Sequence, residues 1–410
     1  MTSSTRALLA LGAICAVAAL ALTAAGCGDD ESKGMPTVAG GPQEPALGAE
    51  TAPVPRTNRK AVVQREAGQR RPGPSSFSCF DLADLEQGER PPACWRPFAD
   101  DSPFNRPIPA SPPLDPGSEP IVSFLSLYGG PANLVSGGGG SASDFSHANY
   151  FADWDDPVYT VHCTNDWGTC EPEGKQFRIP AAALPAGHES GDPGLDHHLS
   201  VAQPDGVTLD LWQAQIPSGD GGTLDASWGG LAEIAGDGLG SNATGAMFSG
   251  FAGVIRAEEL AAGRIDHALF AVVPCTTGHV YPAAQSAAEC GASDAPPNGA
   301  RVQLNMTGAE IDALAVPAWK KTILRALSRY GMIVGDTGGS GAFGLQFESG
   351  IVDRAYGRPE RIDRYAIAAR VPERRNDDTG RLEHVFDLGD SVDWAGRLRV
   401  VDPCVSAGTC

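Results

Sequence analysis

Short apolar runs, separated by frequent glycine and proline, make up most of the chain beyond residue 77. Such runs are typical of strands and loops rather than of a helical bundle. The strands that we expect cover residues 158–163, 198–203, 207–214, 267–273, 300–306, 332–334 and 343–348. The predicted fold is therefore mainly β (α+β): an antiparallel β-sandwich or jelly-roll-like domain with long loops and a few short helices.

Helical periodicity is found in two regions. Thr307 and Glu310 form the Thr-x-x-Glu pattern of a capping box, which predicts the start of a helix. Pro317 suits the first turn of a second helix, in which apolar residues recur at helical spacing until Gly331. A shorter helix is expected over residues 257–262.

The clearest local signal is a hairpin whose turn is Pro204-Asp205-Gly206. A three-residue loop pairs apolar side chains across the two strands: Leu199 with Leu211, and Val201 with Leu209. A two-residue loop would mix polar and apolar side chains on both faces, and burial disfavours that mixture. The other face then carries His198, Ser200, Asp210 and Trp212.

This polar hairpin face suggests a saccharide site. Indole rings stack on the apolar faces of sugars, carboxylates bind hydroxyl groups, and an acid–base pair assists glycosidic cleavage. The candidate catalytic residues are Asp210, Asp336, His198 and His267, and the candidate ligand contacts are Trp212 and Ser200. The alternative is an ordinary polar sheet face, with Trp212 partly covered and His267 a structural histidine of an apolar strand.

Two further patterns contain residues with catalytic or metal-binding chemistry. Asp336-Thr337-Gly338 resembles the active-site turn of aspartic proteases, but that reaction needs two aspartates that share a proton. The same three residues recur once, at 378–380. Asp196-His197-His198 does not predict a metal site, because adjacent residues of a strand point to opposite faces. We therefore predict neither a metal nor a cofactor.

The N-terminus predicts export. Arg6 precedes an uncharged apolar segment that closes with Leu22-Thr23-Ala24-Ala25-Gly26-Cys27, a pattern that resembles the lipobox of bacterial lipoproteins. The resemblance implies cleavage before Cys27 and lipidation of that cysteine. The domains that we expect are a signal peptide over residues 1–26, a flexible tether over 27–76, a β-rich extracellular domain over 77–372 and a C-terminal extension over 373–410.

Eight cysteines remain beyond Cys27, and an even number in an exported chain predicts disulfides. They fall into four close couples: Cys79–Cys94, Cys163–Cys170, Cys275–Cys290 and Cys404–Cys410. The predicted C-terminal extension is thus closed by a local disulfide. A zinc site is not indicated, because no Cys-x-x-Cys occurs.

The chain has a formal net charge of −20. An acidic surface repels nucleic acid and anionic lipid headgroups, so no nucleic-acid partner is expected. Attachment to a membrane would therefore use the lipid and not a basic patch. The predicted location is extracytoplasmic, lipid-anchored to the cell membrane.

Several segments within residues 145–350 are similar to an uncharacterised family of secreted bacterial proteins: 236–244, 262–270, 315–321 and 330–336. That resemblance implies no particular activity or catalytic residue. The leading hypothesis is a cell-surface lipoprotein that binds an extracellular polysaccharide; if it is an enzyme, it is a glycoside hydrolase. The alternatives are a non-catalytic binding or envelope-structural lipoprotein and an aspartic-type protease.

Overall fold

The computed structural model of the protein describes residues 80, 82, 85–127, 134–136, 146–190, 195–241, 244–287, 289–338, 343–375, 382–389 and 392–410. All of them lie in the second of two compact units, Gly68–Cys410. The predicted signal peptide, lipobox cysteine Cys27 and tether lie outside the described residues, as does Cys79.

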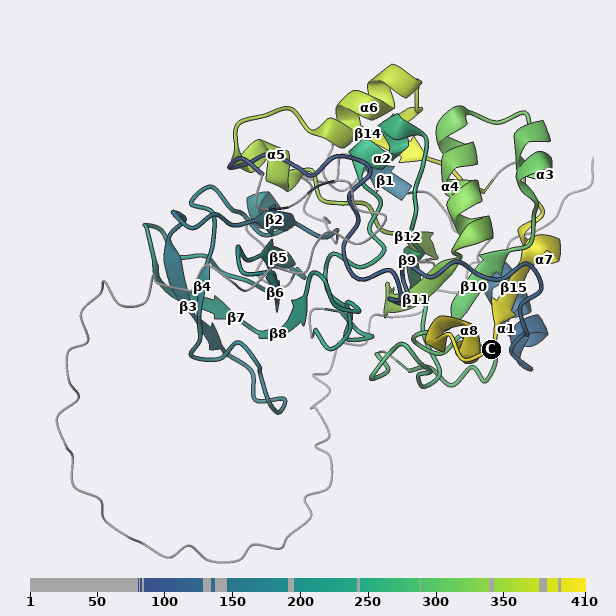
Figure 1. Cartoon of the computed structure of the whole chain (residues 1–410), viewed down its shortest axis with the longest axis horizontal. Helices are drawn as coiled ribbons and strands as arrows, with labels where there is room; N and C mark the ends of the chain where they lie inside the picture. Colours follow the sequence, from purple (N-terminus) through teal and green to yellow (C-terminus); the bar gives the residue numbers. More distant parts are fainter. Residues whose placement is uncertain are drawn as a thin grey trace, which may run out of the picture. The chain divides into compact units, whose positions relative to one another are not determined.

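A five-stranded mixed sheet forms one part of this unit. Its strand order is β12 (Gly344–Leu345), β9 (Leu269–Val273), β11 (Met332–Thr337), β10 (Arg301–Leu304) and β15 (Leu398–Val401). Figure 1 shows α4 (Ala318–Arg329) beside β10, with α3 (Gly308–Ala313) next to α4. The apolar sides of the sheet and of these helices share the largest core cluster, which includes Trp319, Ile323 and Leu327.

Three smaller sheets complete the strands of the described residues. One has the order β2 (Asn149–Phe151), β5 (Leu199–Ala202), β6 (Val207–Trp212), β8 (Trp228–Glu233). The second has the order β4 (Gln176–Arg178), β3 (Val158–Cys163), β7 (Gly222–Ala226), and both contribute to a second core cluster. The third has the order β1 (Leu134–Ser136), β14 (Leu382–Phe386), β13 (Glu373–Arg375).

The remaining helices are short. They are α1 (Ser118–Ser126), η2 (His188–Ser190), α2 (Ala257–Ala262), α5 (Ile351–Ala355), α6 (Arg361–Ala369), α7 (Trp394–Arg397) and α8 (Pro403–Ala407). The capping box that predicted α3 is present, with the Thr307 hydroxyl accepting a hydrogen bond from the Glu310 amide at 3.2 Å. The predicted short helix is α2, which ends at left-handed Gly263.

The fold is mixed α/β, with many strands in several sheets and few helices. One expected feature differs: the pairs β9–β11, β2–β5 and β3–β7 are parallel, so the sheets are not those of a purely antiparallel sandwich. The predicted hairpin is confirmed, since Leu199 pairs with Leu211 and Val201 with Leu209. Gly206 has the left-handed φ of 92° that its turn requires.

The boundary expected at residue 372 is corrected. β15 is the edge strand of the five-stranded sheet and pairs with β10 over four residues. Trp394, which precedes β15 in sequence, and Val400, which lies within it, are buried in the largest core cluster. Residues 392–410 therefore belong to the folded unit and are not an appended extension.

Three of the predicted disulfides are present: Cys163–Cys170, Cys275–Cys290 and Cys404–Cys410. Disulfides persist in oxidising compartments, so they indicate an extracytoplasmic location. The fourth predicted couple includes Cys79 and so cannot be followed within the described residues. Over those same residues, no helix is both long and apolar enough to cross a membrane.

Candidate functional site

A cleft of about 530 Å³ lies where the ends of β6, β8 and β11 come together. Three of the sequence-predicted site residues line it: His198, Trp212 and Asp336. Three residues that the sequence did not single out for a site line it as well: Trp167, Asp196 and Trp228. The cleft therefore combines indole rings with two carboxyl groups.

The three tryptophans form one continuous aromatic cluster. Trp212 ends β6 and is paired across the sheet with Trp228, the first residue of β8. Trp167 lies on the loop closed by the Cys163–Cys170 disulfide and packs on both, with ring centroids 5.6 Å from Trp212 and 5.8 Å from Trp228. Trp167 remains 61% exposed, so the cluster offers indole surface to the cleft.

Asp196 connects the aromatic cluster to the polar side of the cleft. Its Oδ1 accepts a hydrogen bond of 2.9 Å from the Trp212 Nε1–H, which fixes the orientation of that indole. Its Oδ2 lies 3.7 Å from His198 Nε2, and the side chain remains 36% exposed. Asp196 can therefore hold the indole and still present a carboxylate oxygen to a ligand.

The backbone at the cleft is unusual. His197, Gln213 and Met247 have positive φ values of 39°, 52° and 63°, although none is glycine. His197 and Gln213 each adjoin a lining residue in sequence, and Met247 lines the cleft itself. Such conformations cost about 1–3 kcal/mol each and are concentrated at functional sites, because only surrounding structure can hold them.

Asp336 lies near the end of β11, just past an irregularity in its pairing with β9. Its carboxylate accepts hydrogen bonds from the Gly245 amide at 2.9 Å and from the Thr337 amide at 2.8 Å. Burial outweighs these bonds and, with a smaller contribution from the negative charge of Asp196, raises the pKa of Asp336 to about 6. Near neutral pH this carboxyl group can exchange a proton with a ligand.

His198 is neutral at pH 7. Burial, reinforced by the nearby His197, lowers the pKa of His198 to about 4. Its ring packs edge-on against His147 at 4.9 Å, and burial also lowers the pKa of His147 to about 3. His198 thus adds no positive charge to the cleft.

Asp210 and Ser200, predicted to share the ligand-binding face, lie behind the cleft. They pair as expected, but both are buried, and Asp210 is 0% exposed. The Asp210 carboxylate accepts hydrogen bonds from Ser241 Oγ at 2.7 Å, Thr208 Oγ1 at 3.1 Å and the Gly250 amide at 3.0 Å. The loop that contains Gly250 packs over this face, so Asp210 anchors the loop and does not line the cleft.

His267 is also placed away from the cleft. Its Nε2 lies 3.1 Å from Glu259 Oε1, and Glu259 is in turn paired with Arg256. All three side chains are buried. His267 therefore has the structural role that the sequence left open as the alternative.

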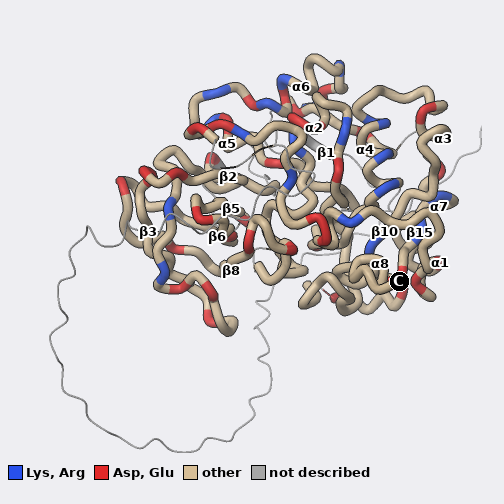
Figure 2. Tube along the Cα trace, viewed as in Figure 1, with Lys and Arg blue, Asp and Glu red and all other residues tan. Residues whose placement is uncertain are grey.

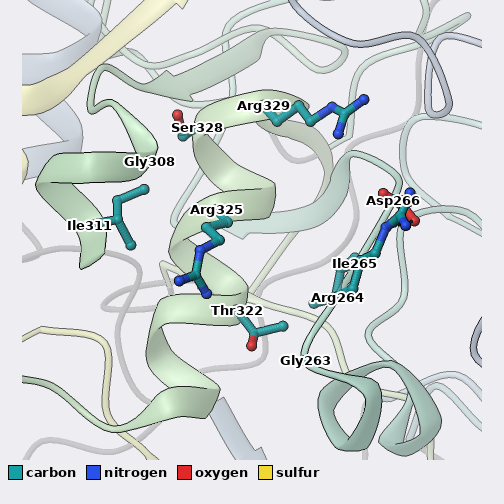
Figure 3. A pocket seen from close by; sticks show the side chains of 10 residues that line it. All are labelled: Gly263, Arg264, Ile265, Asp266, Gly308, Ile311, Thr322, Arg325, Ser328 and Arg329. Carbon is teal, nitrogen blue, oxygen red and sulfur yellow. Dashed lines mark ion pairs between the residues drawn. The ribbon is translucent and has the colours of Figure 1, made fainter.

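A second hollow of about 460 Å³ lies over α4 and contains none of the candidate residues. Figure 3 shows Arg264 next to Asp266 on one side, with Arg325 and Arg329 on α4. Arg264 is ion-paired with Asp266, and Arg325 with Asp312. Two of the three arginines that line this hollow are therefore already neutralised by ion pairs. The aromatic cleft is the stronger candidate for a ligand-binding site.

Comparisons of the chain with protein-family models, with curated proteins and with solved structures give no match. The resemblance to secreted bacterial proteins therefore stays a prediction. In the described part of the chain, no cluster of three or more His, Cys, Asp or Glu side chains is arranged to hold a metal ion.

Proposed function

We propose that the aromatic cleft binds a saccharide chain outside the cytoplasm. The observation that carries the proposal is the joint placement of Trp167, Trp212 and Trp228 with Asp196 and Asp336 around one cleft. Indole faces cover the apolar faces of sugar rings, while carboxylates accept hydrogen bonds from their hydroxyl groups. The disulfides support the extracytoplasmic setting, and lipidation at Cys27 would keep the protein at the cell membrane.

A specific observation favours hydrolysis in addition to binding. Glycoside hydrolases use one carboxylic acid to protonate the leaving oxygen and a second carboxylate to activate water or to stabilise the sugar cation. The raised pKa of Asp336 suits the acid, and Asp196 takes the place of Asp210 as the second carboxylate. In this step the glycosidic C–O bond breaks and Asp336 gives its proton to the leaving oxygen. Water adds to the sugar carbon and gives one of its protons to the Asp196 carboxylate, so that a proton has to return from Asp196 through solvent to Asp336 before the next turnover.

The two alternatives have less support in the cleft. An aspartic protease needs a second aspartate that shares a proton with Asp336, whereas the Asp196 carboxylate is engaged by the Trp212 indole. A purely structural lipoprotein has no need for exposed indole surface beside a carboxyl group of raised pKa. A binding protein without hydrolysis uses the same cleft and differs only in the reaction.

The test is calorimetric titration with hexasaccharides of glucan, xylan, mannan, galactan and chitin. Trp212→Ala removes stacking area and should weaken binding by about 1–3 kcal/mol, or roughly tenfold to a hundredfold, with a small change in melting temperature. Trp154→Ala is the matched control, because Trp154 is 53% exposed but does not line the cleft. Equal binding by both variants, or a large loss of stability in Trp212→Ala without any bound glycan, would contradict the proposal.

A further inference from the structure

The charged residues that line the cleft limit which glycans it can bind. Two carboxyl groups, Asp196 and Asp336, line it, and none of the lining residues is lysine or arginine. Four segments within two residues of a lining residue in sequence lie outside the described residues: 191–194, 242–243, 288 and 339–342. They contain no lysine or arginine either. No basic group is therefore available in these residues to neutralise a negative ligand.

The other polar and aromatic groups of the cleft also disfavour the binding of an anion. His198 is neutral at pH 7 because its pKa is lowered to about 4, so it cannot pair with an anion. Indole faces carry the negative side of a ring quadrupole and so disfavour an anion placed over them. Asp196 and Asp336 already raise the cost of a further negative charge between them, as the contribution of Asp196 to the raised pKa of Asp336 shows.

Arginine side chains line the second hollow instead of the cleft. Figure 2 shows blue segments along α4, where Arg325 and Arg329 lie over the second hollow, and red segments near β6 and β8. Glycans with uronate, sulfate or phosphate groups need such cations for recognition, usually arginine. The cleft that has the aromatic platforms lacks them, and the hollow that has the arginines lacks the platforms.

We infer that the cleft is selective for an uncharged pyranose glycan and rejects chains that carry carboxylate groups. This inference rests on the proposed saccharide function and adds the substrate class. In the bound state the ring faces lie on the three indoles, and ring hydroxyls donate hydrogen bonds to the Asp196 oxygens. A carboxylate at the sugar C6 would be brought close to Asp196 or Asp336 without a compensating cation.

The test compares hexasaccharides that differ only at C6: β-1,4-glucan with β-1,4-glucuronan, β-1,4-mannan with β-1,4-mannuronan, and galactan with galacturonan of the same anomeric linkage. In any pair that binds, the neutral member should bind at least about tenfold more tightly at low salt, because two carboxylates at close range repel. The preference should shrink at about 1 M salt, where the Debye length falls to about 3 Å.

Asp196→Asn identifies the source of the preference. The amide oxygen can still accept the Trp212 N–H, so the indole stays in place, while one negative charge is lost. The preference for the neutral member should then fall severalfold. Asp155→Asn removes the same charge from an exposed position that does not line the cleft, and it should leave the preference unchanged.

The outcomes separate the two proposals. A uronate chain that binds as tightly as its neutral counterpart overturns the inference and leaves the saccharide function standing. A preference that Asp196→Asn and Asp155→Asn reduce equally also overturns it, because net charge would then be the cause. Failure of every hexasaccharide to bind, xylan and chitin included, overturns the saccharide function together with the inference. Binding of xylan or chitin with failure of all the neutral members of the pairs overturns the inference alone.

Discussion

At the scale of single residues, the two carboxyl groups of the cleft are prepared for different roles. Asp196 is partly exposed and holds the Trp212 indole, whereas Asp336 receives two amide hydrogen bonds in a more buried setting. Burial raises the pKa of Asp336 to about 6 in spite of those bonds. A pair of carboxyl groups in unlike environments is the arrangement by which one acts as the acid and the other stays ionised.

The acid role of Asp336 predicts the direction of a pH dependence. Below about pH 6 Asp336 is protonated and can donate, so kcat/KM for a hydrolysed hexasaccharide should be at its plateau. Above that pH it should fall about tenfold per pH unit, as the protonated fraction falls. Asp336→Asn should lower turnover by about 10²–10⁴-fold and remove this limb. The measurement is release of reducing ends across pH, with melting temperatures recorded for each protein.

Asp155→Asn is the control for that experiment, since it changes an acidic residue that does not line the cleft. It should retain the wild-type profile. A folded Asp336→Asn protein that keeps the alkaline limb would show that another group titrates.

At the scale of elements, the cleft depends on a loop that is attached to a buried carboxylate. Gly245 and Met247 line the cleft, and a few residues later the Gly250 amide donates to Asp210 at 3.0 Å. Ser241, before the loop, donates to the same carboxylate. Asp210 thus fixes both ends of the segment that faces a ligand, although it lies behind the cleft.

Gly250→Ala tests this attachment. A Cβ atom at Gly250 would overlap with Ser200 Oγ and lie 3.1 Å from Asp210 Oδ1, so the buried Ser200 side chain has to rotate or the loop has to move. We expect a loss of about 1–3 kcal/mol in the free energy of unfolding and weaker glycan binding. Urea denaturation and calorimetry measure the two effects.

Gly291→Ala is the matched control, because nothing lies within 4 Å of a Cβ atom at Gly291. It should be close to neutral in both measurements. Wild-type stability in Gly250→Ala would mean that the loop is not tightly fixed on β5 and β6.

At the scale of the whole molecule, the C-terminal residues are part of the main core. β15 pairs with β10, and Trp394, Leu398 and Val400 are buried in the cluster shared with α4. The apolar side chains that residues 373–410 bury are Phe386, Leu388, Trp394, Leu398, Val400, Val401 and Val405. At about 1.5–3 kcal/mol for each large apolar side chain, their removal would cancel a stability of 5–15 kcal/mol.

A chain that ends at residue 372 should therefore fail to fold. It should lack near-ultraviolet circular dichroism and be digested quickly by a nonspecific protease. A chain that lacks only Thr409 and Cys410 loses the Cys404–Cys410 disulfide but keeps β15, and it should stay folded. A stable, cooperatively melting protein from the shorter chain would contradict the assignment of these residues to the core.

The predicted lipid anchor at Cys27 is also a property of the whole molecule, and a labelling experiment tests it. Metabolic labelling with a clickable fatty acid should mark the wild-type protein and spare Cys27→Ala, because lipidation requires the cysteine thiol. Equal labelling of the two proteins would exclude Cys27 as the site.

Features set by neighbouring residues were determined by the sequence alone. The hairpin register followed from apolar pairing of Leu199 with Leu211, and the start of α3 from the capping box at Thr307, since both depend on contacts between nearby residues. The three disulfides in the described residues join cysteines only 6 to 15 positions apart. Close couples in a chain predicted to be exported were sufficient to predict them.

Contacts between distant segments were decided only by the tertiary structure. Parallel pairing of β3 with β7 brings together strands about sixty residues apart, and no local pattern specifies it. The same folding places Trp167 on Trp212 and turns Asp196 toward the indole through a left-handed backbone at His197. Asp210 appeared free on a polar face because alternation predicts direction along a strand but not which loop will cover it.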